Sequence, residues 1–256
     1  MKEHLEIEQH AQRLESGHTT HQPGVLRSET WLTLETRQAQ RLITGRRAEP
    51  AKPEIIGLTR FSSLLRPIWS GARSDDPYAD WWLIKIEEIL DGAKRELDKI
   101  EHGIQQRLHD IPAIDVSVAH SVEPIKVPLQ FSNPYAFRGA YLIADCDRVI
   151  RAILTARHVG LIGRAESEKL IYEAGRAVRR ALSSPVGYRF KSINRDDLQQ
   201  QTARGMEAKN EMGELPDEVL EGKRRASYGP SPVVKAGFGR GRIRLRNRPE
   251  EEGSTR

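Results

Sequence analysis

The sequence predicts a mainly α-helical protein with a small β-ribbon, and two patterns predict it. Apolar residues recur at steps of three and four over residues 77–109, which is typical of one face of an α-helix about 50 Å long. Apolar residues alternate with polar residues and proline over residues 124–131, which indicates a short strand. We therefore expect a helical domain that carries a short extended segment.

The composition excludes several classes of protein. The chain has 256 residues, of which 38% are hydrophobic and 30% are charged, and it has one cysteine. No stretch approaches the roughly 18 uncharged apolar residues that a membrane span needs, and the first ten residues lack an apolar signal region. A single cysteine cannot form a disulfide within the chain and agrees with a reducing cytoplasm. Secreted, membrane-spanning and zinc-ribbon proteins are therefore excluded, and we expect a cytoplasmic location.

The charge is unevenly placed along the chain. Residues 223–256 have a net charge of +7, whereas the other 222 residues have a net charge of −2. We therefore predict a flexible leader over residues 1–28, a helical core domain over residues 29–212, and a disordered basic tail over residues 213–256. The histidines of the leader match no standard metal-ligand spacing; they are His4, His10, His18 and His21.

The first half of the core domain predicts one strand and three helices. Residues 30–36 have the composition of a strand, and residues 37–46 indicate a short helix that ends at Gly45. Residues 58–69 predict an amphipathic helix that Pro67 should kink or stop. The long helix follows, with Asp76 as its N-cap and Pro77 at its first position.

The second half predicts a strand, a helix, a turn and a helix in that order. Residues 113–121 and 124–131 indicate a hairpin or two adjacent extended segments. A helix capped by Asn133 runs to about Gly160 and is apolar around much of its circumference, so it should be central. A helix over residues 165–183 follows, and Asn194 should cap a shorter polar helix. We therefore predict a ribbon-helix-helix-like element at about residues 124–183, embedded in the larger helical domain.

No pattern predicts catalysis, a metal site or a cofactor. The carboxylates Asp75, Asp76 and Asp80 are better explained by capping of the long helix than by a divalent ion. Asp145 and Asp147 have arginines three and four residues away, so internal ion pairs are expected. Cys146 is better explained as an inert thiol of the core, and His158 as a side chain at the end of a helix. The GFGRGR run has neither a preceding strand nor a following helix, so it is not a phosphate loop.

The strand before the helix pair predicts contact with DNA. In a ribbon-helix-helix protein, two chains each contribute one strand to a ribbon that enters the major groove. Alternation places Ile125, Val127, Leu129 and Phe131 on one face, and it places Lys126, Pro128 and Gln130 on the other.

Lysine and glutamine side chains can bind guanine and adenine edges, so Lys126 and Gln130 are the predicted base contacts. Arg138, Arg164 and Ser167 are the predicted phosphate contacts. Two features argue against the motif: its first helix is unusually long, and Pro128 lacks the N–H that a paired strand needs. The strand at residues 30–36 is an alternative ribbon.

The tail offers a second signal for nucleic-acid binding. Arginines alternate with other residues near Phe238, and each can neutralise a phosphate without reading sequence; they are Arg240, Arg242, Arg244, Arg246 and Arg248. A solubilising tail explains the same composition equally well.

Several blocks of the chain resemble one known family. They include LTLETRQAQRLITGR (32–46), DDPYADWWLIKIEEIL (75–90), VPLQFSNPYAF (127–137) and AYLIADCDRVIRAILTARHVGLI (140–162). In this order they are similar to the integrating-conjugative-element proteins related to the plasmid transfer regulator AcaB. The resemblance implies a bacterial cytoplasmic protein of a mobile element and, for the AcaB branch, a ribbon-helix-helix DNA-binding regulator of conjugation genes. It implies no catalytic residues.

Two functions therefore remain open. The first is a homodimeric regulator that binds promoter double-stranded DNA, without a membrane or a small-molecule substrate. The alternative is a non-enzymatic accessory protein of the conjugation machinery that acts through protein–protein contacts and has the same helices. The sequence does not decide which strand forms the ribbon, residues 30–36 or residues 125–131.

Overall fold

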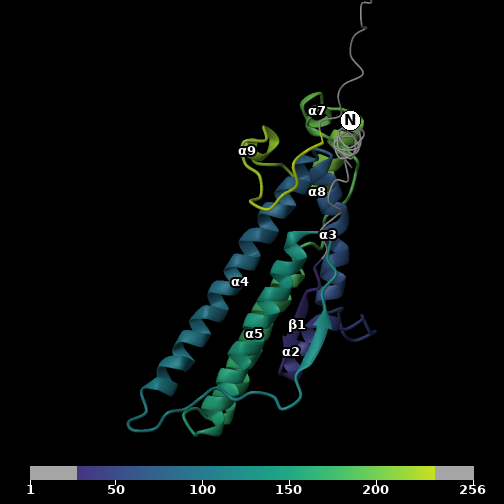
Figure 1. The fold of residues 1–256 in the computed structure, drawn as a ribbon. Helices are drawn as coiled ribbons and strands as arrows, with labels where there is room; N and C mark the ends of the chain where they lie inside the picture. Colours follow the sequence, from purple (N-terminus) through teal and green to yellow (C-terminus); the bar gives the residue numbers. More distant parts are fainter. Residues whose placement is uncertain (1–27, 234–256) are drawn as a thin grey trace, which may run out of the picture. The chain divides into compact units, whose positions relative to one another are not determined.

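The other long helices pack around α4 (Pro77–His109), in the computed structural model that describes residues 28–233 (Figure 1). The Asp76 carboxylate accepts hydrogen bonds from the backbone N–H groups of Tyr78 and Ala79, and Pro77 occupies the first helical position. The predicted long helix and its cap are therefore confirmed with the same bounds. The apolar stripe of α4 faces the core, because its members recur on one side of the helix.

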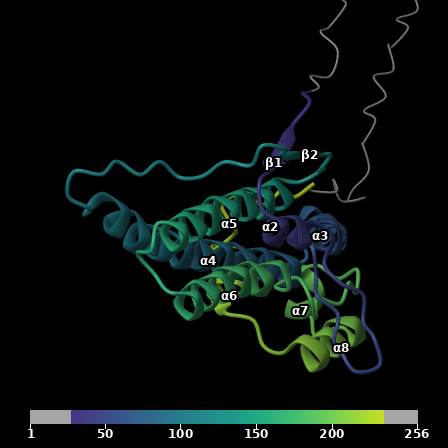
Figure 2. The ribbon, with the colours of Figure 1, turned by 90° about the horizontal axis from the view of Figure 1, so that it is seen from below.

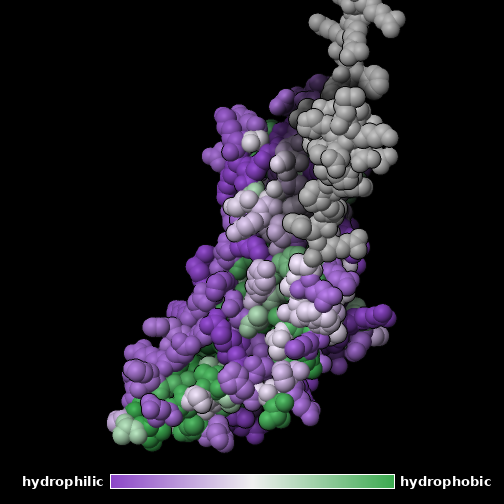
Figure 3. All heavy atoms as spheres, in the orientation of Figure 1, coloured by the Kyte–Doolittle hydropathy of each residue, from purple (hydrophilic) through white to green (hydrophobic). Residues whose placement is uncertain are grey.

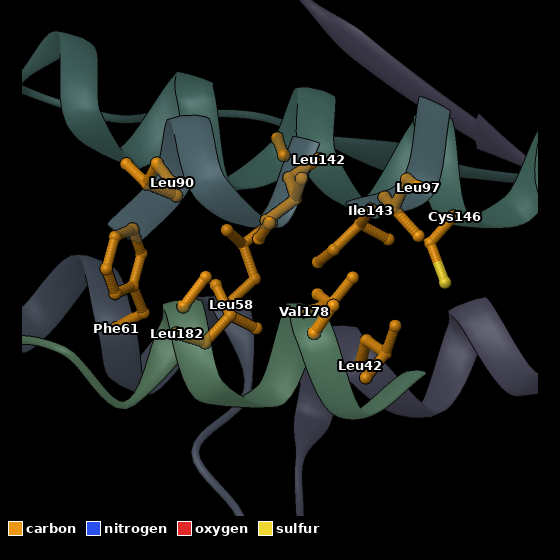
Figure 4. Packing of buried hydrophobic residues seen from close by; sticks show 14 of the residues in the cluster. Leu42, Leu58, Phe61, Leu90, Leu97, Leu142, Ile143, Cys146, Val178 and Leu182 are labelled. Atoms are coloured by element: carbon orange, nitrogen blue, oxygen red, sulfur yellow. The ribbon is translucent and has the colours of Figure 1, made fainter. Parts of the chain in front are cut away.

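Two further helices complete the central packing, α5 (Pro134–His158) and α6 (Arg164–Leu182). Figure 4 shows Leu97 of α4, Ile143 and Cys146 of α5, and Val178 of α6 directed toward a shared interior. Helix α5 has buried residues around most of its circumference, since it lies against α4, α6 and the ribbon. The predicted central position of this helix is thus confirmed.

Helices α2 (Arg37–Thr44) and α3 (Leu58–Arg73) lie beside α5. Helix α2 ends at Gly45, as predicted. The prediction that Pro67 stops the helix is wrong, because α3 continues six residues beyond it. Phe61 and Leu65 before the proline, and Ile68 after it, are all buried. Both halves therefore gain enough core packing to offset the one backbone hydrogen bond that the proline removes.

The ribbon joins the two strands that the sequence presents as rivals. β1 (Trp31–Leu34) pairs antiparallel with β2 (Ile125–Pro128) of the same chain, with Thr33 opposite Lys126. The prediction that residues 125–131 pair with their own copy in a second subunit is therefore wrong for this edge of β2. Pairing within the chain directs the apolar residues of both strands toward the hydrophobic core, where β1 contacts α5. In Figure 2 the ribbon lies on the side of α5 opposite α6.

The predicted hairpin between residues 113–121 and 124–131 does not form. Ala113 lies in a turn, and residues 114–121 have no regular secondary structure and make no ladder. They contact other elements instead. The Ala119 N–H donates to Thr155 Oγ1 of α5 at 2.9 Å. The segment is therefore a connection along α5.

The C-terminal part of the core domain adds three short helices: α7 (Arg195–Gln199), α8 (Ala203–Met212) and α9 (Asp217–Leu220). Asn194 forms a capping box with Asp197 at the start of α7, as its sequence indicates. The predicted disorder begins too early, because residues 213–233 contain α9 and contact α4. Arg224 of this segment binds Glu88 of α4 at 2.6 Å.

The surface of the described residues is mainly hydrophilic in the view of Figure 3. Apolar side chains gather there near the end of α4 and the connection that follows it. Ile114 and Val122 of this connection are exposed. None of the helices described has the length and apolarity that crossing a membrane requires.

Candidate nucleic-acid interface

The outward side of the two strands forms a small exposed surface, which we call the ribbon face. It consists of Trp31, Thr33, Lys126, Pro128 and Gln130, all of which are exposed. The antiparallel register places Thr33 opposite Lys126 and Trp31 opposite Pro128. Pro128 lies at the end of β2, where its missing N–H costs the ladder little. The predicted orientation of Lys126 and Gln130 is thus observed.

The opposite side of the ribbon is apolar and packs on the core. Leu32, Leu34 and Leu129 are buried, and Ile125 and Val127 are partly buried against the same cluster. This alternation follows from the two-residue period of a strand, in which successive side chains point to opposite faces. Burial of one side therefore determines that the polar side faces outward.

Asp147 of α5 positions the ribbon relative to the helices. Its carboxylate accepts hydrogen bonds from the backbone N–H groups of Glu35 and Thr36, at 2.9 and 2.8 Å, and from the Thr36 hydroxyl at 2.7 Å. These donors lie between the end of β1 and the start of α2. The predicted ion pair of Asp147 is therefore not formed, whereas Asp145 does bind Arg148, at 2.9 Å.

A second carboxylate binds the connection before β2. Glu35 accepts a hydrogen bond from the Ser121 N–H at 2.7 Å and forms an ion pair with Arg151 of α5 at 2.9 Å. His120 lies 3.3 Å from the same carboxylate. The hydrogen bond from Ser121, with smaller contributions from Arg151 and His120, lowers the pKa of Glu35 despite its partial burial. Both strands are thus tied to α5 at the same end of the ribbon, where β1 ends and β2 begins.

Arg138 does not lie on the ribbon face. Its guanidinium bonds to Asp91 and lies 3.7 Å from Glu87, both of α4. It also stacks on the Tyr228 ring, 5.1 Å from the ring centroid, and the side chain is only 20% exposed. The predicted phosphate contact is therefore replaced by a link between α4, α5 and the C-terminal segment.

The start of α6 provides one accessible candidate. Arg164 is 84% exposed and forms a surface ion pair with Glu168 at 2.8 Å, so it can exchange this partner for a phosphate. Ser167 is completely buried and its hydroxyl has no hydrogen-bond partner, so it cannot reach a phosphate. The predicted tail contacts lie outside the described residues; they are Arg240, Arg242, Arg244, Arg246 and Arg248.

The remaining chemical candidates have structural roles. Asp75 and Asp80 bond to Arg195 and Arg225, while Asp76 caps α4 and accepts a hydrogen bond from the Tyr188 hydroxyl at 2.8 Å. Burial raises the pKa of both Asp76 and Asp80. Within residues 28–233, no group of three or more histidine, cysteine, aspartate or glutamate residues could bind a metal ion.

Cys146 is buried, as its apolar neighbours indicate. Burial raises the pKa of its thiol to about 12, so the reactive thiolate does not form at neutral pH. His158 is an exposed residue of the last turn of α5, the helix-end position that the sequence indicates.

Sequence reasoning missed three residues that shape this surface. The sequence places Trp31 and Thr33 in a rival ribbon and predicts an ion pair for Asp147. The period of two in residues 31–34 matches that of 125–131, but a shared period does not show which strands pair. No local pattern indicates the role of Asp147, because its partners lie 111 and 112 residues away.

The comparisons with known proteins identify the chain as a member of a family of transcriptional regulators. The chain matches the family described as transcriptional regulator AcaB over residues 22–232, and it belongs to this family.

One solved structure supports the fold. It is the crystal structure of selenomethionine-containing AcaB from uropathogenic E. coli, with a TM-score of 0.54 and 16% sequence identity. The alignment covers 78% of this chain and 97% of that chain. At this identity the likeness concerns the fold alone. A comparison with curated proteins found no match.

Proposed function

We propose that this protein binds promoter DNA through the ribbon face and regulates conjugation genes on an integrating conjugative element or plasmid. The observation that carries the proposal is the exposed polar side of an antiparallel two-stranded ribbon in a member of a transcriptional-regulator family. A ribbon of this width fits the major groove of B-DNA. The protein would act in the bacterial cytoplasm, without catalysis.

The side chains of the ribbon face suit base edges. The Lys126 ammonium can donate to guanine O6 and N7, and the Gln130 amide can bind adenine N6 and N7. Trp31 and Pro128 offer apolar surface to thymine methyl groups, and Thr33 can hydrogen-bond to either strand of the groove. Arg37, exposed at the start of α2, directly follows this surface and would contact a phosphate. Affinity and base preference thus come from different residues.

The experiment compares promoter fragments of the element with scrambled DNA at two salt concentrations. The variant Lys126→Ala/Gln130→Ala should reduce the preference for promoter DNA at least tenfold, because each bidentate base contact contributes about 1–3 kcal/mol of discrimination. The matched control Lys99→Ala/Gln106→Ala removes the same exposed residue types from α4 and should leave the preference unchanged. Equal affinity of the wild type for both DNAs would refute the proposal.

The basic tail is tested separately. Deletion of residues 234–256 removes the tail arginines and should weaken binding to promoter and scrambled DNA equally. The dependence of affinity on salt should also become less steep, since fewer counterions are released. An unchanged salt dependence would show that these arginines do not contact phosphates.

The proposal includes a homodimer, in which each subunit contributes its own complete ribbon. Two such ribbons related by a two-fold axis would match a palindromic operator. Sedimentation of the full chain, alone and with an operator fragment, should show two protein chains per DNA. One chain per DNA would exclude this part of the proposal.

One observation favours the accessory-protein alternative. Trp31 is 54% exposed on the ribbon face, and tryptophan is enriched at protein interfaces. Trp31→Ala should then leave DNA preference intact and weaken contact with a conjugation protein. Under the DNA-binding proposal, the same change should lower the affinity for promoter DNA.

A further inference from the structure

A groove on the side of α5 away from the ribbon has the features of a ligand site. It lies between α2, the connection from Gly45 to Ile55, the end of α5, and α6, with a volume of about 850 Å³. Ligand pockets of soluble proteins commonly have volumes of about 300–1,000 Å³. Apolar residues line its floor, including Leu42, Ile150 and Leu154. We call this space the arginine groove.

Four arginines line the groove and give it a positive charge. They are Arg41, Arg46, Arg157 and Arg179. Arg46 donates to the Pro53 carbonyl oxygen at 3.1 Å, and within residues 28–233 none of the four forms a salt bridge. The only carboxylate of the lining is Glu168, which already binds Arg164 at 2.8 Å. The groove is therefore complementary to an anion.

The guanidinium groups and the neighbouring ring of Tyr172 indicate which kind of anion the groove would bind. All four cations are guanidinium groups, which bind phosphate and carboxylate in a bidentate manner. Tyr172 is 61% exposed at the same groove, and the Arg179 guanidinium lies 5.7 Å from the centroid of its ring. An exposed ring beside a guanidinium is a platform for stacking a planar heterocycle.

We propose that the arginine groove binds a nucleotide, with its phosphates on Arg41 and Arg157 and its base stacked on Tyr172. The apolar floor would contact the sugar and the edge of the base. A free nucleotide and a terminal nucleotide of a single strand share this chemistry. The proposal is independent of promoter binding, because the groove and the ribbon face consist of different residues.

A duplex backbone and a bare inorganic anion explain less of the structure. A duplex would present phosphates and sugars without exposed base faces, so Tyr172 and the apolar floor would have no role. An inorganic anion would use the arginines only. A nucleotide combines the negative charge and the planar ring, and therefore uses each feature of the groove.

The test measures binding by isothermal titration calorimetry with the full chain. The probes are nucleoside mono-, di- and triphosphates, a single-stranded 12-mer and inorganic pyrophosphate. Arg41→Gln and Arg157→Gln should each weaken nucleotide binding at least tenfold, and Tyr172→Ala should weaken it at least fivefold without affecting pyrophosphate. The control Arg176→Gln removes an exposed arginine of α6 that lines a different groove, and should change binding less than twofold.

Each outcome decides the proposal. Tighter binding of the 12-mer than of any free nucleotide, with the same dependence on the three groove residues, would identify a strand as the source. The proposal is overturned if no nucleotide or 12-mer binds at millimolar concentration. It is also overturned if pyrophosphate binds as tightly as the nucleotides, or if the groove variants bind as the wild type does. Circular dichroism of each variant separates lost binding from lost folding, and Lys126→Ala/Gln130→Ala should leave nucleotide binding unchanged.

Discussion

Asp147 shows how one side chain can set the position of a functional surface. Its carboxylate accepts three hydrogen bonds from the junction of β1 and α2, and only 4% of the residue is exposed. Two of the donors are backbone N–H groups, which no side-chain rotation can redirect. Any loss of this acceptor leaves those donors without a partner in a site with little water.

We expect Asp147→Ala to lower the free energy of unfolding by about 2–4 kcal/mol, because an unsatisfied buried polar group costs about 1–3 kcal/mol. Urea denaturation measures the change. Asp145→Ala is the matched control, since Asp145 forms surface ion pairs with Lys94 and Arg148 and should cost less than about 1 kcal/mol. Equal losses in the two variants would contradict the role assigned to Asp147.

Residue roles differ in how far the sequence predicts them. The caps Asp76 and Asn133 are predictable, because each bonds to backbone N–H groups two or three residues away. Asp147 and Arg138 are not, because their partners are distant in sequence. Their charges indicate ion pairs or ligands equally well until the fold brings the partners together.

At the scale of elements, the carboxylate of Glu35 links the ribbon to α5, and its charge depends on pH. The hydrogen bond from Ser121, aided by Arg151 and His120, lowers the pKa of Glu35 below its usual value of 4.5. A carboxyl group with a lowered pKa in the folded state contributes stability above its unfolded pKa, and this contribution is lost as the pH falls through the folded pKa. The contact with the connection should therefore weaken only below about pH 4.5.

Hydrogen exchange of the Ser121 amide tests this expectation. Its protection, corrected for the intrinsic pH dependence of exchange, should be constant from pH 7 to 5 and fall at lower pH. Glu35→Gln should have lower protection at pH 7 and no further loss on acidification, since the amide oxygen accepts a hydrogen bond without a charge. The Ala119 amide, which bonds to Thr155, is the internal control. A pH-independent difference between Ser121 and Ala119 in the wild type would contradict the assignment.

The elements themselves were largely predictable, whereas their pairing was not. Capping residues and a clear period determine α4 and α5, and their predicted bounds agree with the structure. The sequence also locates both strands, within residues 30–36 and 124–131. A strand of four residues has no local signal for its partner, since any strand with one apolar face fits the same ladder. The pairing of β1 with β2 places the apolar faces of both strands against the hydrophobic core.

At the scale of the whole molecule, one ionic cluster joins the start of α4 to the C-terminal third of the described chain. Arg195 of α7 bonds to Asp75 and Asp80, and Arg225 bonds to the same two carboxylates. Arg195 also donates to the Val219 carbonyl of α9 at 3.1 Å. Residues more than a hundred positions apart thus share one network, in which Asp80 and Arg195 are buried and Asp75 and Arg225 are partly exposed. This network explains why the order of the chain extends past the predicted end of the core domain.

We expect Arg195→Met to lower the free energy of unfolding by about 3 kcal/mol, because Asp80 then keeps only its longer ion pair with Arg225, at 3.6 Å. The side chain of Asp80 is 3% exposed, and burial already raises its pKa, so it cannot regain solvation without a movement of α7 and α9. Urea denaturation of the full chain measures the loss, and Asp80→Asn/Arg195→Met should recover part of it. The control Arg180→Met breaks the half-exposed pair with Glu96 and should cost less than about 1 kcal/mol. If Arg195→Met costs no more than Arg180→Met, the C-terminal segment packs on α4 through its apolar contacts, and the ionic cluster contributes nothing to the cohesion of the molecule.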